Sequence, residues 1–157
     1  MTDIYEQAKD KLNNFIKNDI LTYSKNRNYD YGPKNRSNVS HLSKYITHRV
    51  INEYDVINLA LSEYSLTKIE KYVQEVFWRV YWKGWLEHRP QVWNDYYEYS
   101  DNNPNSEGYK EAIEGTTGIV CFDNWVEELV NENYLHNHTR MWFASIWIFT
   151  LNLPWQL

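Results

Sequence analysis

The chain has 157 residues, among them 8 Trp and 14 Tyr, and a formal net charge of −5. This length favours one domain with a genuine core. The single cysteine, Cys121, excludes an intrachain disulfide and a cysteine-based metal cluster. The charge does not indicate a general nucleic-acid binder, and the apolar run 141–148 is too short to cross a membrane. We therefore expect a soluble, cytoplasmic protein with no membrane partner.

Helical periodicity dominates the first half of the chain. Residues 1–20 form a charged amphipathic pattern, which predicts a first helix. An irregular stretch follows within 23–50, where six Lys and Arg residues stand against a single acidic residue. Apolar spacing predicts two short helices, one beginning near Leu42 and one near Val56. The longest helix is predicted from Lys68 to His88.

The second half of the chain is also expected to be helical. Residues 91–108 are rich in Asn, Asp, Ser and Tyr and are predicted to form an exposed connecting loop. Helices are expected over 109–114, 122–131 and 136–151. We find no alternating strand pattern, no P-loop and no GxGxxG motif, so a Rossmann domain is excluded. The fold class is all-α, with residues 1–157 expected to form a single domain.

The segment YLHNHTRM (134–141) places two histidines, an asparagine and an arginine at the start of an otherwise apolar, aromatic helix. This polar start favours a flat ligand with polar edges, such as a planar cofactor. A metal pair made of His136 and His138 is not favoured, because no third ligand stands at helical spacing. We expect no metal.

The predicted long helix carries Glu75, Trp78, Arg79 and Trp82 on one face, at positions i, i+3, i+4 and i+7. Such a face can stack a base or a flavin on tryptophan and bind its polar edges through the charged groups. A Glu75–Arg79 ion pair flanked by packed tryptophans is the structural alternative.

The segment VSHLSKYI (39–46) offers the hydroxyls of Ser40 and Ser43 near backbone N–H groups at a helix start. These donors, together with Lys44, can bind an anion. An ordinary serine helix cap is the alternative interpretation.

Four segments in one order resemble the FAD-binding helical domain of the DNA photolyase/cryptochrome family: VSHLSKYI (39–46), QEVFWRVYW (74–82), GTTGIVCFDNWVEELVNENYLHNH (115–138) and TRMWFASIWIFTLNLPW (139–155). The similarity is greatest to a bacterial deoxyribodipyrimidine photolyase-like branch and covers roughly residues 20–157. It implies a helical bundle like the N-terminal part of that FAD-binding domain, without the family's Rossmann-like antenna domain.

The resemblance implies FAD as the cofactor, bound by Tyr23, Ser40, His41, Leu42, Ser43, Tyr72, Arg79, Tyr134 and Arg140. It assigns the contacts with a flipped-out pyrimidine dimer, or with the space between dimer and flavin, to Glu75, Trp78, Asn137 and Met141. Trp155 matches the middle member of the tryptophan chain that passes an electron to the flavin. The implied reaction is light-driven electron transfer from FAD to a cyclobutane pyrimidine dimer, so UV-damaged DNA is an expected partner.

The sequence departs from the family pattern at Val39, Val80 and His138, where the family usually has threonine, glutamate and arginine. The segment that lines the flavin ring in the family would follow residue 157. Losing about three ring-side hydrogen bonds at ~1 kcal/mol each weakens FAD binding by about two orders of magnitude. We therefore expect a second chain or a homo-oligomer to complete the flavin pocket. The alternatives are a non-catalytic module for FAD, nucleic acid or protein, and a remnant fragment on the same scaffold.

Overall fold

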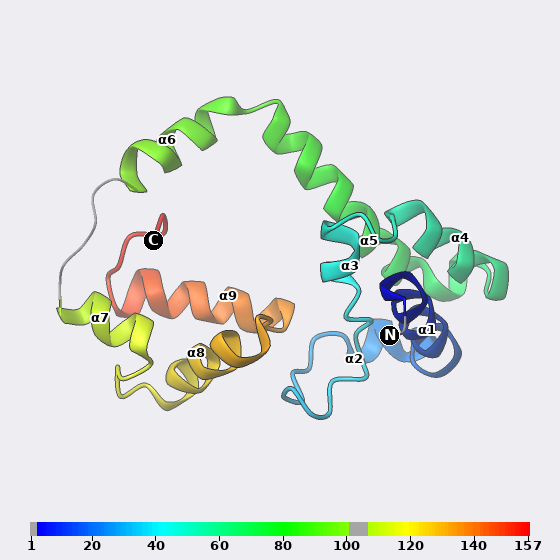
Figure 1. Cartoon of the computed structure of the whole chain (residues 1–157), viewed down its shortest axis with the longest axis horizontal. Helices are drawn as coiled ribbons and strands as arrows, with labels where there is room; N and C mark the ends of the chain where they lie inside the picture. Colours follow the sequence, from blue (N-terminus) through cyan, green and yellow to red (C-terminus); the bar gives the residue numbers. More distant parts are fainter. Residues whose placement is uncertain (1–2, 101–106) are drawn as a thin grey trace. The chain divides into compact units, whose positions relative to one another are not determined.

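The computed structural model describes residues 3–100 and 107–157 (Figure 1). All regular structure within these residues is helical, which confirms the predicted all-α fold class. The described residues form two compact units. The N-terminal unit contains residues 3–29 and 35–88, and the C-terminal unit contains 30–34, 89–100 and 107–157. That residues 1–157 constitute one domain of the predicted type stays a prediction.

The N-terminal unit contains α1 (Ile4–Asn18), η1 (Ile20–Thr22), α2 (Tyr23–Asn26), α3 (Ser43–Thr47), α4 (Glu53–Glu63) and α5 (Leu66–Glu87). Helix α1 begins after Asp3, whose carboxylate accepts a hydrogen bond from the Tyr5 N–H at 3.1 Å, as expected for an N-cap. Helix α5 confirms the predicted long helix, shifted by at most two residues at its ends.

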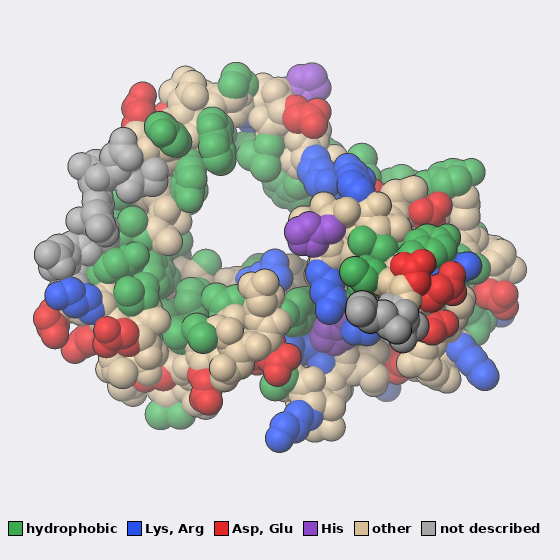
Figure 2. All heavy atoms as spheres, viewed as in Figure 1, with side chains coloured by type: hydrophobic (Ala, Val, Ile, Leu, Met, Phe, Trp, Pro, Cys, Tyr) green, Lys and Arg blue, Asp and Glu red, His purple; other side chains and the backbone are tan. Residues whose placement is uncertain are grey.

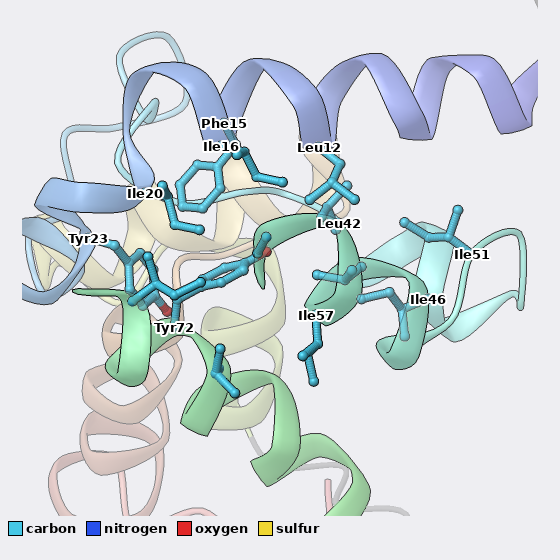
Figure 3. Close-up of a cluster of buried hydrophobic side chains, with 14 of the residues drawn as sticks. Leu12, Phe15, Ile16, Ile20, Tyr23, Leu42, Ile46, Ile51, Ile57 and Tyr72 are labelled. Carbon is cyan, nitrogen blue, oxygen red and sulfur yellow. The ribbon is translucent and has the colours of Figure 1, made fainter. Parts of the chain in front are cut away.

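The core of the N-terminal unit consists of apolar side chains that its helices pack against one another (Figure 3). Helix α1 contributes side chains spaced by three or four residues, and α5 contributes Ile69, Tyr72 and Val73. The rings of Phe15, Tyr23 and Tyr72 are in mutual contact, with centroids 5.1 to 5.9 Å apart. This aromatic cluster fixes α2 and α5 against α1, and so determines where their polar side chains lie.

The C-terminal unit contains α6 (Pro90–Ser100), α7 (Glu107–Glu114), α8 (Val120–Glu132), α9 (Asn137–Ser145) and the π-helical turn η2 (Ile146–Thr150). Its core is centred on Phe122, which is fully buried and stacks on Phe143 with ring centroids 4.4 Å apart. The last helix was predicted to run as an α-helix to Leu151. In the structure α9 ends at Ser145, and the chain continues in π geometry through η2.

The prediction of a connecting loop over 91–108 is wrong for residues 91–100, because these residues belong to helix α6, which spans Pro90–Ser100. Proline is favoured at the first position of a helix, where its fixed φ fits and its missing N–H is not needed. The rings of Trp93 and Tyr96 are one helical turn apart and lie in contact, with their centroids separated by 5.6 Å. Residues 101–106 of the predicted loop lie outside the described residues, and residues 107 and 108 already belong to α7.

The turn before α8 depends on the carboxylate of Asp123. It accepts hydrogen bonds from the N–H and hydroxyl of Thr117 at 3.1 and 2.7 Å, and from the Gly118 N–H at 3.0 Å. Gly115 and Gly118 both have positive φ, which glycine adopts without steric cost. The GTTG segment is thus explained as the structural start of α8.

Hydrophobic side chains are exposed along α6 and along the C-terminal end of α5 (Figure 2). On α5 these include Phe77, Trp78, Tyr81 and Trp82, each about half exposed. Among the described residues, no helix combines the length and apolar character that a membrane span requires.

Candidate functional site

The residues that the resemblance singles out fall into two groups, one in each unit. The group in the N-terminal unit consists of Tyr23, Ser40, His41, Leu42, Ser43, Tyr72, Glu75, Trp78 and Arg79. The group in the C-terminal unit consists of Tyr134, Asn137, Arg140, Met141 and Trp155. Each unit thus carries polar and aromatic residues of the predicted site.

Glu75, a charged residue of the first group, is held by two close partners. Its carboxylate accepts a hydrogen bond from the Tyr23 hydroxyl at 2.7 Å and forms an ion pair with the guanidinium of Arg27. The side chains of Arg27 and Glu75 are only 18% and 17% exposed, so the pair is shielded from water. The structure therefore joins a residue predicted to bind FAD, Tyr23, to one predicted to face the lesion.

The predicted alternative, an ion pair between Glu75 and Arg79, is wrong. Arg79 instead pairs with Glu53 at the start of α4, where Nε lies 3.5 Å from Oε1, and donates a hydrogen bond to Thr47. Glu53 is itself held by Arg49 at 3.0 Å. The i,i+4 spacing allowed the Glu75–Arg79 pair, but tertiary partners supplied by α2 and α4 replace it.

Two buried tyrosines lie at the centre of this group. Burial raises the pKa of Tyr72 to about 12, an effect that the neighbouring Ser40 hydroxyl partly offsets. Burial, and next the hydrogen bond to Glu75, raise the pKa of Tyr23 well above its usual range. Both phenols therefore keep their protons at neutral pH, and Tyr23 acts as a hydrogen-bond donor to the carboxylate.

The Ser40–Ser43 segment is not an ordinary serine cap, which was the alternative interpretation. Helix α3 begins at Ser43 itself, its N-cap is Leu42, and no side chain caps it. His41 has a left-handed φ of 52°, and its Nε2 lies 2.8 Å from the Arg36 carbonyl oxygen, which fixes the turn. The serine hydroxyls are thus not used in capping α3.

Lys11 adds a positive charge that the sequence did not single out. Partial burial, and next repulsion from Lys44, lower the pKa of Lys11. Lys44 lies on α3 and directly follows Ser43. The only sequence signal was an amphipathic helix with lysines on its polar side, which is too common to indicate a site.

Trp78 is 47% exposed, and the ammonium group of a lysine lies over its indole ring. The Nζ of Lys71 lies 4.6 Å from the ring centroid. Trp78 therefore presents an aromatic surface that is accessible to a ligand, on the same helix as Glu75.

In the C-terminal unit, the polar start of α9 is well ordered by local contacts. His136 is the N-cap, and its Nδ1 accepts a hydrogen bond from the His138 N–H at 3.2 Å. Arg140 donates from Nε to the Leu135 carbonyl oxygen at 3.1 Å and lies 5.6 Å from the Tyr134 ring centroid. One histidine of the YLHNHTRM segment is thus explained by helix capping.

Asn137 and Met141 are exposed and lie four residues apart on α9, which places them on one face. Trp155 is 56% exposed, and its ring centroid lies 6.3 Å from that of Tyr96 on α6. The indole N–H of Trp147 donates to the Pro154 carbonyl oxygen at 2.8 Å and anchors the segment that carries Trp155.

Comparisons with known proteins identify the family to which this chain is similar. Residues 72–157 match the model of the FAD binding domain of DNA photolyase. The chain is 26% identical to the deoxyribodipyrimidine photo-lyase of Agrobacterium fabrum over 156 residues, and 26% identical to that of Alkalihalophilus pseudofirmus over 163 residues. These alignments cover 95% and 97% of the chain but only 32% of each relative.

A bacterial class III photolyase from Agrobacterium tumefaciens has a similar structure, with a TM-score of 0.79 and 26% sequence identity. The superposition covers 97% of this chain and 32% of the photolyase. The chain thus spans about a third of the length of the relatives that it matches.

Proposed function

The chain belongs to the family of FAD-binding domains of DNA photolyase, and from this premise we propose that it is a photolyase-like flavoprotein for light-driven repair of pyrimidine dimers in DNA. FAD is the cofactor that family membership indicates. We further propose that another chain or a second copy contributes to the flavin pocket. A cytoplasmic location stays a prediction.

We infer that the N-terminal unit binds the diphosphate of FAD. Lys11 and Lys44 repel each other, so an anion bound beside them would relieve that repulsion. The hydroxyls of Ser40 and Ser43 do not cap α3; Ser43 directly precedes Lys44, and the Ser40 hydroxyl neighbours Tyr72. Two cations and two hydroxyl donors match the charge and hydrogen-bonding capacity of a diphosphate.

Replacing Lys11 with glutamine is expected to weaken FAD binding about five- to tenfold, because one charge-assisted contact with the diphosphate is lost. The same change should not lower the urea midpoint of unfolding, since it also removes the repulsion from Lys44. FAD and riboflavin titrations followed by flavin fluorescence measure the effect.

Riboflavin lacks the diphosphate, so its affinity should be the same for wild type and Lys11→Gln. Lys17→Gln, at an exposed lysine of the same helix, is the matched control and should leave both affinities unchanged. Equal FAD affinity for Lys11→Gln and wild type would remove Lys11 from the proposed diphosphate site.

When bound in its reduced form, FAD would supply on photoexcitation the electron that splits a cyclobutane pyrimidine dimer, and it would take the electron back once the dimer has opened. The chain's own residues bind and orient the substrate. We assign stacking on the extruded dimer to the exposed indole of Trp78. We assign the Glu75 carboxylate, which Tyr23 and Arg27 hold in place, to accepting a hydrogen bond from a pyrimidine N–H.

In the C-terminal unit, we assign Asn137 and Met141 to contacts with the flavin and the lesion, since both are exposed on one face of α9. Tyr134 and Arg140, which lie against each other, are assigned to the flavin. Trp155, exposed and in contact with Tyr96, is assigned to supplying an electron to the flavin.

The observation that carries the proposal is the anchored Glu75 beside the exposed Trp78 on α5, within a chain of this family. The test is repair of UV-irradiated oligothymidylate under blue light by the protein reconstituted with FAD and then reduced with dithionite without oxygen, with dimers counted by chromatography. We expect dimer loss in the light and none in the dark. Trp78→Ala should bind FAD normally yet fail to bind the irradiated oligonucleotide.

Reconstituted protein that binds FAD but repairs no dimers would contradict the repair function. It would favour the alternative, a non-catalytic FAD-binding module on the same scaffold. Retained affinity of Trp78→Ala for the irradiated oligonucleotide would contradict the role assigned to Trp78.

A further inference from the structure

Lys71 contacts both side chains on α5 that the proposed function assigns to the DNA lesion. Its Nζ lies 4.6 Å from the centroid of the Trp78 ring and 4.0 Å from Oε1 of Glu75. The three residues occupy positions i, i+4 and i+7, which share one face of the helix. Lys71 therefore lies where a ligand of Glu75 and Trp78 would also lie.

Glu75 does not depend on Lys71 for charge compensation. The Tyr23 hydroxyl and the Arg27 guanidinium already hold its carboxylate at closer range than the 4.0 Å to Lys71. The ion pair between Lys71 and Glu75 contributes little to stability, because the two groups lie 4.0 Å apart and the Lys71 side chain is 30% exposed. Arg27 and Lys71 carry two positive charges against the single negative charge of Glu75, so this group has a net charge of +1.

The ammonium group of Lys71 has three N–H donors and reaches water. It rests on one face of the Trp78 indole, and an indole has a second face on which a base can stack. A strand that places a base against Trp78 also brings its phosphates close by. The whole chain carries a net charge of −5, so a local cation is needed to attract a phosphate at this point.

We propose that Lys71 binds a phosphate of the DNA strand whose bases contact Trp78, an assignment that rests on the proposed function. Residues that neutralise phosphates set the salt dependence of nucleic-acid binding, whereas purely structural residues do not change it. The salt dependence therefore separates this role from a packing role.

The test measures binding of UV-irradiated and unirradiated oligothymidylate to the FAD-reconstituted protein in the dark, across a series of salt concentrations. A single-stranded probe avoids the cost of extruding the lesion from a duplex. For Lys71→Met, the slope of log affinity against log salt should become shallower by about 0.7, and affinity at low salt should fall about five- to tenfold. Lys71→Arg, which keeps the charge, should retain the wild-type slope.

Lys9→Met is the matched control. Lys9 is a lysine of the same unit that also rests on an aromatic ring, with Nζ 5.3 Å from the Tyr5 ring centroid. This variant should keep the wild-type slope. An unchanged slope for Lys71→Met, or an equal loss of slope in Lys71→Arg, would overturn the assignment of Lys71 while leaving the repair function intact. Wild type that binds neither probe would overturn the proposed function itself, and this assignment with it.

Discussion

Glu75→Ala is expected to lower the free energy of unfolding by about 2–3 kcal/mol. The change leaves the Arg27 guanidinium without its ion-pair partner and the Tyr23 hydroxyl without its acceptor, and both side chains are largely shielded from water. The cost is thus mainly that of unpaired polar groups, not of lost packing. Urea unfolding followed by circular dichroism measures it.

Two variants separate the contributions. Glu75→Gln keeps an acceptor for Tyr23 and loses only the charge, so it should cost less than Glu75→Ala. Glu70→Ala removes an exposed glutamate on the same helix, which accepts a hydrogen bond from Gln74, and should change stability by about 0.5 kcal/mol or less. A loss for Glu75→Ala no larger than that for Glu70→Ala would show that Glu75 is not anchored as described.

Stability is expected to fall steeply as pH rises above about 10. Tyr72 keeps its proton in the folded state up to a pKa of about 12, whereas the unfolded chain releases it near the ordinary value of 10.0. Between these values the unfolded state binds fewer protons than the folded state, so ionisation favours unfolding. Tyr72 alone accounts for a loss on the order of 3 kcal/mol across this window.

Tyr23 adds to the same trend, since its pKa is also raised. Lys11 acts in the opposite sense just below pH 10.5, because its pKa is lowered in the folded state. Urea midpoints between pH 9 and pH 12, compared for wild type and Tyr72→Phe, measure the effect. The variant lacks the ionisable group, so its stability should fall less with pH. Parallel curves would mean that the Tyr72 hydroxyl is not protected by burial.

Periodicity alone was sufficient to predict α1, which buries one continuous apolar face, and the extent of α5, which buries its apolar side chains only at Ile69, Tyr72 and Val73. Helix α6 was missed for a physical reason. Its Asn, Asp and Ser residues favour loops by composition, and only Pro90, the first residue of α6, is favoured at a helix start. The change to π geometry after Ser145 left no signal in the apolar pattern.

The site shows a similar division. The sequence placed Glu75 and Trp78 on one helix face, because that follows from spacing. It could not identify Arg27 as the partner of Glu75, since six cations lie within 23–50 and Arg79 stood at the more obvious i+4 position. That choice depends on how the Phe15, Tyr23 and Tyr72 rings bring α2 against α5, which is a property of tertiary packing.

FAD binding is the most direct test of the central claim that this chain is a photolyase-type flavoprotein. The measurement is a titration of the purified chain with FAD, followed by flavin fluorescence and visible absorbance, with folding verified by circular dichroism. We predict saturable binding of one FAD per chain, weaker for Lys11→Gln than for wild type. A folded wild-type chain that shows no saturable FAD binding, alone or at concentrations that favour self-association, would contradict the account.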